Sequence, residues 1–180
     1  MIDVQEKARE ISSWKTIRRW IADMVSIEPT IMRRVSHRKF GDLGSWLEKG
    51  SVGYCGCLVG TTALELVRAR NSFKPTTDTY FGEAEFVRTK DTETEEKGDA
   101  CDAADIVEEL SPFASNMKVA ALTAGMAAID LQYAVGQDEA VALIKDEIRK
   151  QLLLRAKHIR GGLKRARAAK RKSDGTFKAA

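Results

Sequence analysis

The sequence predicts an all-α protein: a compact helical bundle with a Gly-rich loop, an acidic linker and a basic C-terminal tail. Apolar residues recur at three- and four-residue steps over several long segments, which is the period of an amphipathic helix. The 180 residues include only 3 prolines, and 7% of them are aromatic, so a β-sandwich is not indicated. This length is sufficient for one domain with a real core.

The N-terminal half begins with two predicted helices. Residues 3–25 form an amphipathic helix, and Pro29 suits the first turn of a short second one. Residues 36–56 are Gly-rich and include a predicted short helix from Asp42 to Lys49, and a further helix spans about 58–70. The apolar face of the first helix comprises Val4, Ala8, Ile11, Trp14, Ile17, Ile21 and Met24.

Polar and loop-forming residues dominate the middle of the chain. Residues 71–80 contain Pro75 and several threonines and are predicted to be a loop, whereas 83–90 is ambiguous. Residues 91–100 lack large apolar side chains and indicate a solvated linker. We therefore expect an N-terminal helical subdomain (1–90), an acidic linker (91–100), a C-terminal helical subdomain (101–162) and a basic tail (163–180).

Capping residues delimit the predicted helices of the second half. Asp102 caps a helix that runs to Leu110, and Ser111-Pro112 suits the start of the next, about 112–135. Small residues beside a bulky stripe place that helix at the centre of a bundle. The small residues are Ala120, Ala121, Ala124, Gly125 and Ala128; the bulky stripe comprises Val119, Leu122, Met126, Ile129 and Tyr133.

The last predicted helix lies between glycines. Gly136 ends the preceding helix, and Asp138 caps a helix that carries Val141, Ile144, Ile148, Leu152 and Ile159. Gly161-Gly162 is predicted to stop it near residue 160.

No feature predicts export or membrane insertion. The longest uncharged apolar stretch, between Lys118 and Asp130, has 11 residues, whereas a span needs about 20. The first ten residues lack the apolar core of a signal peptide. We therefore expect no membrane partner, and a cytoplasmic location, or a virion location for a phage protein.

The Gly-rich segment Ser51-Val-Gly-Tyr-Cys-Gly-Cys-Leu-Val-Gly60 leads into a helix. A thiol at a helix N-terminus can have a lowered pKa, so Cys55 or Cys57 is a candidate nucleophile. The alternative is structural packing of small side chains at a turn. Cys55, Cys57, Cys101 and His37 total four candidate zinc ligands, but a single Cys-x-Cys pair lacks the usual two-pair spacing. No metal or other cofactor is predicted.

Two resemblances fall on this segment. Tyr54-Cys-Gly-Cys-Leu-Val59 resembles the Asp-Cys-Ser-Gly-Leu-Val segment of NlpC-like cell-wall peptidases, which would make Cys55 catalytic. Those enzymes place a general-base histidine downstream on a strand, whereas the only downstream histidine here is His158, in a predicted helix, and His37 lies upstream.

The second resemblance covers about residues 36–70. Arg38-Lys-Phe-Gly-Asp-Leu-Gly-Ser-Trp46 and Val52-Gly-Tyr-Cys-Gly-Cys-Leu-Val-Gly60 resemble small uncharacterised helical proteins of bacteria and phages. Their motif is Arg-Phe-Asp-Met-x-x-Trp, a spacer, and Cys-Gly-Thr-x-x-Cys-Ile-Ala-Gly. Val52 stands where the group has its first cysteine. The resemblance implies a helical fold and a bacterial or phage source. The matching residues are Phe40, Trp46, Gly53, Cys57 and Gly60.

Charge is divided unevenly along the chain. Residues 155–180 contain ten Lys or Arg and one acid, a formal charge of +9, while the other 154 residues hold 20 bases and 25 acids, a formal charge of −5. A cationic segment of this kind binds polyanions, and we expect it to be largely disordered when unbound. The candidate nucleic-acid-binding residues are Arg155, Lys157, Arg160, Lys164, Arg165, Arg167, Lys170, Arg171 and Lys172.

Three functions are consistent with these observations. The first is a non-enzymatic helical binding protein whose tail contacts nucleic acid or a nucleoprotein assembly. The second is a structural subunit of a larger assembly, which allows for an oligomer. The third is a cysteine hydrolase that uses Cys55 or Cys57. A tail that only solubilises the protein, or that docks on its own acidic linker, is the alternative to polyanion binding.

Overall fold

A computed structural model of the chain describes residues 12–44, 48–50, 53–70, 73–75, 86–88, 100–111 and 116–177. Most of these residues are helical, which confirms the predicted helical character. The helices are α2 (Ser12–Ile27), α3 (Pro29–His37), α4 (Leu58–Arg70), α5 (Ala103–Leu110), α6 (Met117–Val135) and α7 (Gln137–Phe177). The predicted helix at 58–70 has the observed bounds of α4, and the part of the predicted 3–25 helix before Ser12 lies outside the described residues.

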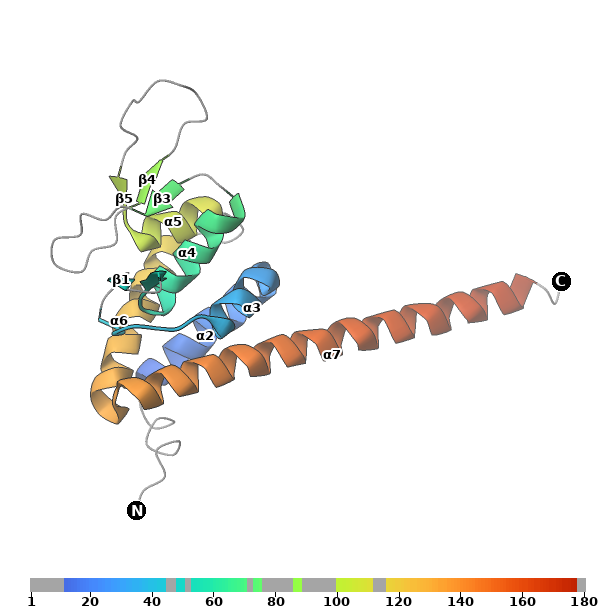
Figure 1. Cartoon of the computed structure of the whole chain (residues 1–180). Coiled ribbons are helices and arrows are strands. Elements are labelled where there is room, and N and C mark those ends of the chain that lie inside the picture. The colour runs from blue at the N-terminus through green and yellow to red at the C-terminus, as the bar shows by residue number, and fades with distance from the viewer. Residues whose placement is uncertain are drawn as a thin grey trace, which may run out of the picture.

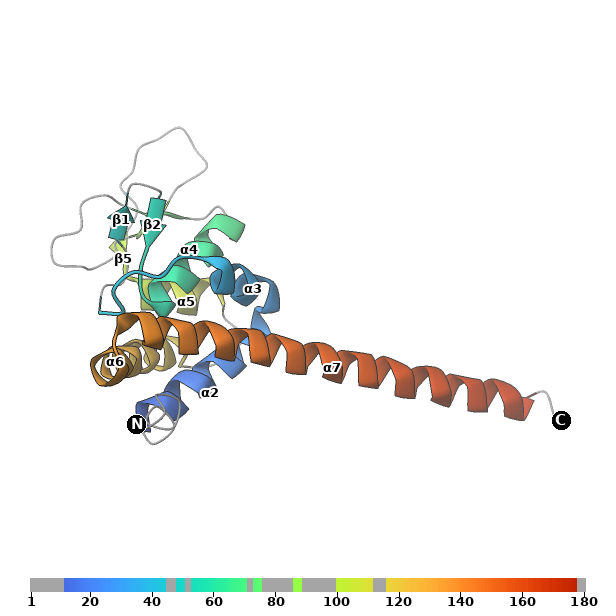
Figure 2. The ribbon, with the colours of Figure 1, turned by 60° about the horizontal axis from the view of Figure 1, so that its bottom comes forward.

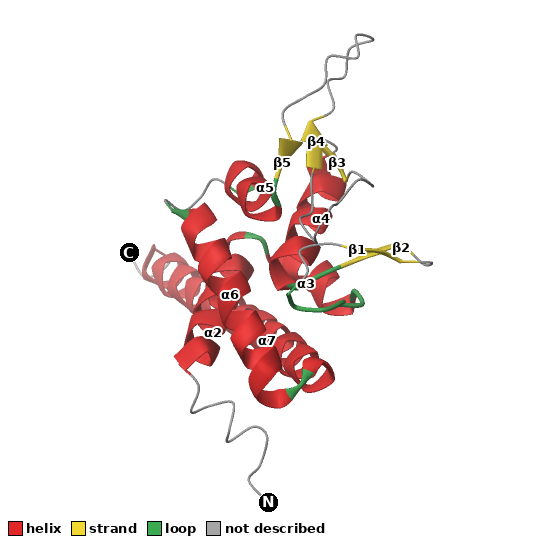
Figure 3. Cartoon of the chain, turned by 90° about the vertical axis from the view of Figure 1, so that its left-hand side faces the viewer, coloured by secondary structure: helices red, strands yellow, loops and turns green. Residues whose placement is uncertain are grey.

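Within the described residues, five short strands that the sequence patterns did not predict lie between the helices (Figure 3). β1 (Glu48–Gly50) and β2 (Gly53–Cys55) form an antiparallel hairpin. β3 (Phe73–Pro75), β4 (Phe86–Arg88) and β5 (Ala100–Cys101) form an antiparallel sheet in that order. The predicted helix from Asp42 to Lys49 is wrong at both of its described ends, because residues 42–44 are not helical and β1 begins at Glu48. Ala100, the last residue of the predicted 91–100 linker, lies in β5, and the other residues of this linker lie outside the described residues.

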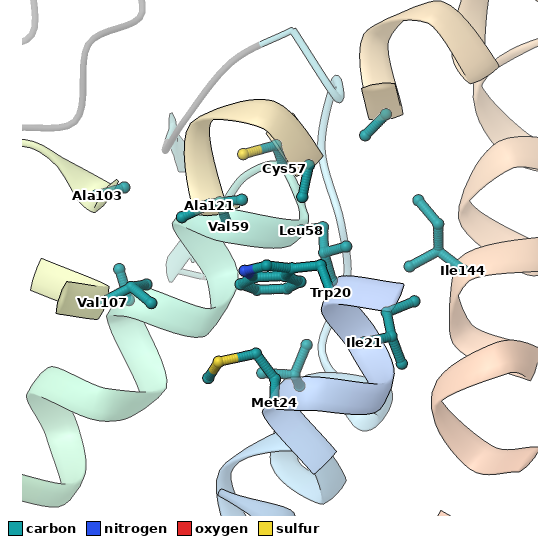
Figure 4. Packing of buried hydrophobic residues seen from close by; sticks show 14 of the residues in the cluster. Trp20, Ile21, Met24, Cys57, Leu58, Val59, Ala103, Val107, Ala121 and Ile144 are labelled. Atoms are coloured by element: carbon teal, nitrogen blue, oxygen red, sulfur yellow. The ribbon is translucent and has the colours of Figure 1, made fainter. Parts of the chain in front are cut away.

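One hydrophobic core receives buried side chains from all six described helices. Trp20 and Ile21 of α2 lie between residues of α4 and Ile144 of α7 (Figure 4). Helices from both sides of the predicted linker thus share this core. Since a buried aliphatic or aromatic side chain contributes about 1.5–3 kcal/mol by leaving water, the shared core couples the folding of the two halves.

Helix α6 turns mainly one of its two apolar stripes toward the core. Val119, Met126 and Tyr133 of the bulky stripe are 61%, 64% and 84% exposed. The small residues face inward instead, with Ala121, Ala124, Gly125 and Ala128 buried. Small side chains let helix axes approach closely, and α6 packs against α2, α4, α5 and α7. The sequence left open which of the two apolar stripes faces the core, and in the structure it is mainly the stripe of small residues, with Leu122 of the bulky stripe packed at its edge.

The cap of α5 is as predicted, but the start of α6 is not. Asp102 caps α5, with its side chain accepting a hydrogen bond from the Asp105 N–H at 2.9 Å. Ser111 caps the C-terminus of α5 rather than starting the next helix, and its hydroxyl donates to Glu28 Oε1 at 3.2 Å. Helix α6 starts later, at Met117, after Asn116 with a φ of 66°.

The C-terminal end of α7 differs most from the sequence-based prediction. Gly136 ends α6 as predicted, with a φ of 92°, but Gly161-Gly162 does not end α7, which runs for 41 residues to Phe177. Each glycine costs a helix about 1 kcal/mol relative to alanine, but extending an established helix is far easier than nucleating one. The Ala-, Lys- and Arg-rich sequence after the pair favours continuation. Hence the segment expected to be disordered is helical as far as Phe177.

Helix α7 extends well beyond the rest of the protein. At about 1.5 Å per residue its 41 residues measure about 60 Å. Its first half lies against α2, α3 and α6, and its second half projects away from them (Figures 1 and 2).

Candidate polyanion interface

The first half of α7 is attached to the body by apolar packing. Ala140, Ile144 and Ile148 are buried, and Glu147, also buried, pairs with Arg18 of α2 at 3.3 Å. Farther along, the Arg155 guanidinium donates to the carbonyl oxygen of Ser26 at 2.8 Å. Arg155, one of the nine candidate binding residues, therefore helps to attach the helix to the body.

From Lys157 onward the basic side chains of α7 are exposed wherever they are described. Because steps of three and four residues return to the same side of a helix, five of them share one face, which we call the basic face. It comprises Lys157, Arg160, Lys164, Arg167 and Arg171. It spans 14 residue steps, about 21 Å at the helical rise. By the same period Arg165, Lys170 and Lys172 lie on other sides of the helix.

A shallow groove of about 370 Å³ runs along the basic face. Its polar lining consists of Arg160, Lys164, Arg167 and Arg171, and Leu163 and Ala168 complete it. Leu163 is exposed, as is Ile159 one turn earlier. The basic face thus combines a row of cations with some apolar surface.

Several acids of the body are paired with bases of the body, whereas the basic face has no such partner among the described carboxylates. Glu65 pairs with two arginines, Glu28 with Arg70, and Asp105 with Lys118. Among the described residues, no carboxylate lies within ion-pair distance of any of the five cations on the basic face. These side chains are positioned to interact with charges outside the protein.

The candidate nucleophile Cys57 is in an unsuitable environment. It is 3% exposed, and burial raises the pKa of its thiol to about 11. Its Sγ accepts a hydrogen bond from the Gly60 N–H at 3.2 Å, at the start of α4. The expectation of a lowered pKa is therefore wrong for Cys57, because desolvation outweighs the helix terminus. The backbone of Cys55 lies in β2, and its side chain is outside the described part.

The candidate zinc ligands are only partly placed. Cys55 and Cys101 have side chains outside the described part. His37 lies on the last turn of α3 among arginines, and His158 is exposed on α7. In the part of the chain that is described, no three His, Cys, Asp or Glu residues are grouped as a metal site requires.

A second charged site, which the sequence analysis missed, lies between α3 and α4. An open hollow of about 440 Å³ is lined by Arg34, His37, Arg38, Glu65 and Arg68. The one signal in the sequence is Glu65 itself, a lone acid within the otherwise uncharged stretch from Leu58 to Val67. Its partner Arg38 is 27 residues away, so their proximity follows from the packing of α3 on α4.

Comparison of the chain with protein-family models, curated proteins and solved structures found no match. Within the described residues, no helix has both the length and the apolar character that crossing a bilayer demands. The two charged sites are therefore interpreted from their own geometry.

Proposed function

We propose that this chain is a non-enzymatic helical binding protein that contacts nucleic acid, or a nucleoprotein assembly, through the basic face of α7. The observation that carries the proposal is the projection of this face beyond the body, with no described carboxylate close enough to neutralise it. A body that neutralised these cations itself would leave no charge for a partner.

The proposed binding mode is electrostatic and tolerant of sequence. Lys and Arg bind polyanions by neutralising phosphates and releasing condensed counterions. If the five cations of the basic face each neutralise one phosphate of a duplex, log affinity should fall with log salt concentration with a slope of about −4.5. Base stacking is not the main mode, since Phe177 is the only aromatic residue after Arg155.

The test compares two triple variants with the same change in net charge. Lys164→Gln, Arg167→Gln and Arg171→Gln neutralise the basic face. A matched control, Lys15→Gln, Arg19→Gln and Arg33→Gln, removes three exposed charges from α2 and α3. Fluorescence anisotropy with a labelled duplex and a labelled single strand measures affinity across a salt series.

The first variant should lose most of the affinity and have a salt slope shallower by about 3, while the control keeps both. Deletion of 164–180 should abolish binding without unfolding the body. The proposal is wrong if the truncated protein binds both probes as tightly as the whole chain. It is equally wrong if the control variant weakens binding as much as the basic-face variant, since total charge would then account for the effect.

A second candidate function, a structural subunit of a larger assembly such as one encoded by a phage, is favoured by exposed apolar side chains. Val119, Met126 and Tyr133 lie on α6, and Leu153 and Leu163 on α7. Exposed apolar surface of this kind is typical of protein contacts. Sizing the protein alone and in its native extract by light scattering distinguishes the two: a free binder is small in both samples, whereas a subunit is found in a large complex.

A further inference from the structure

We propose that the hollow between α3 and α4 is a binding site for a phosphate group, separate from the basic face of α7. Three arginines and one histidine line it against a single carboxylate, Glu65. The arginines thus exceed the acid by two positive charges. A phosphate monoester, which is close to a dianion at neutral pH, would balance that excess.

Glu65 holds two of the arginines in place. Its side chain is 2% exposed, and its Oε1 accepts hydrogen bonds from Arg38 Nε at 2.5 Å and Arg68 Nη1 at 3.2 Å. A buried carboxylate with two such partners restricts both guanidiniums before any ligand arrives. Restricting donors in advance lowers the entropy that binding must remove.

Donors remain for a ligand after these contacts. Each guanidinium has five N–H groups, and Glu65 contacts one nitrogen of Arg38 and one of Arg68. The two side chains are still 44% and 39% exposed, so their outer nitrogens are accessible at the hollow. Arginine is the preferred residue for bidentate contact with phosphate.

Arg34 and His37 complete the site from the last turn of α3. Both are exposed, and no ion pair joins Arg34 to any described carboxylate. Arg34 is therefore the best residue to alter, because its replacement leaves the Glu65 contacts intact. Arg33, its neighbour on the same helix, is exposed but does not line the hollow, and so provides a matched control.

The experiment is calorimetric titration with inorganic phosphate at constant ionic strength maintained with chloride. Wild type should bind phosphate saturably, Arg34→Gln about tenfold more weakly, and Arg33→Gln as wild type; tenfold is the effect expected of one lost charge-assisted hydrogen bond. The triple basic-face variant of α7 should bind phosphate as wild type. Circular dichroism confirms that each variant is folded.

Absence of saturable phosphate binding at matched ionic strength would overturn the proposal, as would equal weakening by Arg33→Gln and Arg34→Gln. Loss of binding in the α7 variant alone would place the phosphate on α7 and reject the hollow. The source of the phosphate is identified by repeating the titration with adenosine 5′-monophosphate and with a short oligonucleotide that has or lacks a 5′-phosphate. A preference for the 5′-phosphorylated strand would assign a nucleic-acid end, and equal affinity for all phosphates would assign the free ion.

Discussion

Replacing Gly161 and Gly162 by alanine is expected to stabilise the projecting half of α7. Neither glycine has a positive φ. A Cβ at Gly161 would lie 3.7 Å from Arg165 Nη1, an ordinary contact, and a Cβ at Gly162 would meet nothing within 4 Å. Each substitution therefore gains the full helix preference of alanine over glycine, about 0.8–1 kcal/mol, and the pair gains about 2 kcal/mol.

Hydrogen exchange measured by mass spectrometry tests this gain directly. Residues that follow the pair are protected only while the helix is continuous through it, so amides at about 163–168 should exchange up to roughly 25-fold more slowly in the double variant. The effect should decrease toward Phe177, because fraying from the end does not require the pair to open. Gly136→Ala is the control of opposite sign: its φ of 92° strains an alanine, and stability should fall by about 1 kcal/mol.

Unchanged or faster exchange at 163–168 in the double alanine variant would refute this reasoning. It would mean that the helicity of 163–168 does not depend on continuity through Gly161 and Gly162. The basic residues beyond them would then be a separate segment rather than the continuation of a helix attached to the body.

Four further predictions concern the buried residues of the body and the packing of α7. Burial raises the Cys57 pKa from 9.0 to about 11, so Cys57 should resist iodoacetamide at pH 8 until the protein unfolds; mass mapping that finds it labelled in the folded protein would contradict this burial. The thiol of the unfolded chain ionises at a lower pH than the buried thiol. The contribution of Cys57 to the unfolding free energy should therefore be constant below about pH 9 and fall as the pH rises from about 9 to 11. Urea titrations of Cys57→Ser should lack this fall. Ile144 is buried and Leu163 is exposed. Ile144→Ala should therefore reduce the unfolding free energy by about 2–5 kcal/mol, and Leu163→Ala by less than about 0.5 kcal/mol. Equal losses in urea titration would mean that the first half of α7 is not the half that packs against the body. Glu65→Gln should cost about 1–3 kcal/mol, since an amide replaces a buried acceptor of two guanidinium bonds, and a neutral result would show that the carboxylate contributes nothing to folding.

Local signals in the sequence predicted several helix ends correctly. Asp102 and Gly136 act through their immediate neighbours, a cap and a left-handed φ, so their effect is visible without tertiary structure. The orientation of α6 was not predictable in this way, because both of its sides are apolar. Which side is buried depends on how closely α2 approaches, and the small residues permit the closer contact.

Tertiary packing explains the remaining differences. The strands have two or three residues each, too few for an alternating pattern to be recognised. Gly161-Gly162 is typical of a helix end, but the part of α7 before the pair is stabilised by packing against the body, and the helix continues through the pair. The basic face was predicted as a set of charges, and only the helical conformation of 157–171 aligns five of them.

The position of α7 concentrates positive charge at one end of the described structure. Residues 155–180 carry a formal charge of +9, and α7 extends its basic residues over about 30 Å of helix beyond Lys157, away from the helices that it packs against. In the field of a polyanion such a molecule turns cationic end first before contact. The same concentration of charge should draw the cationic end of one copy toward acidic side chains of another at low ionic strength, an association that salt would suppress.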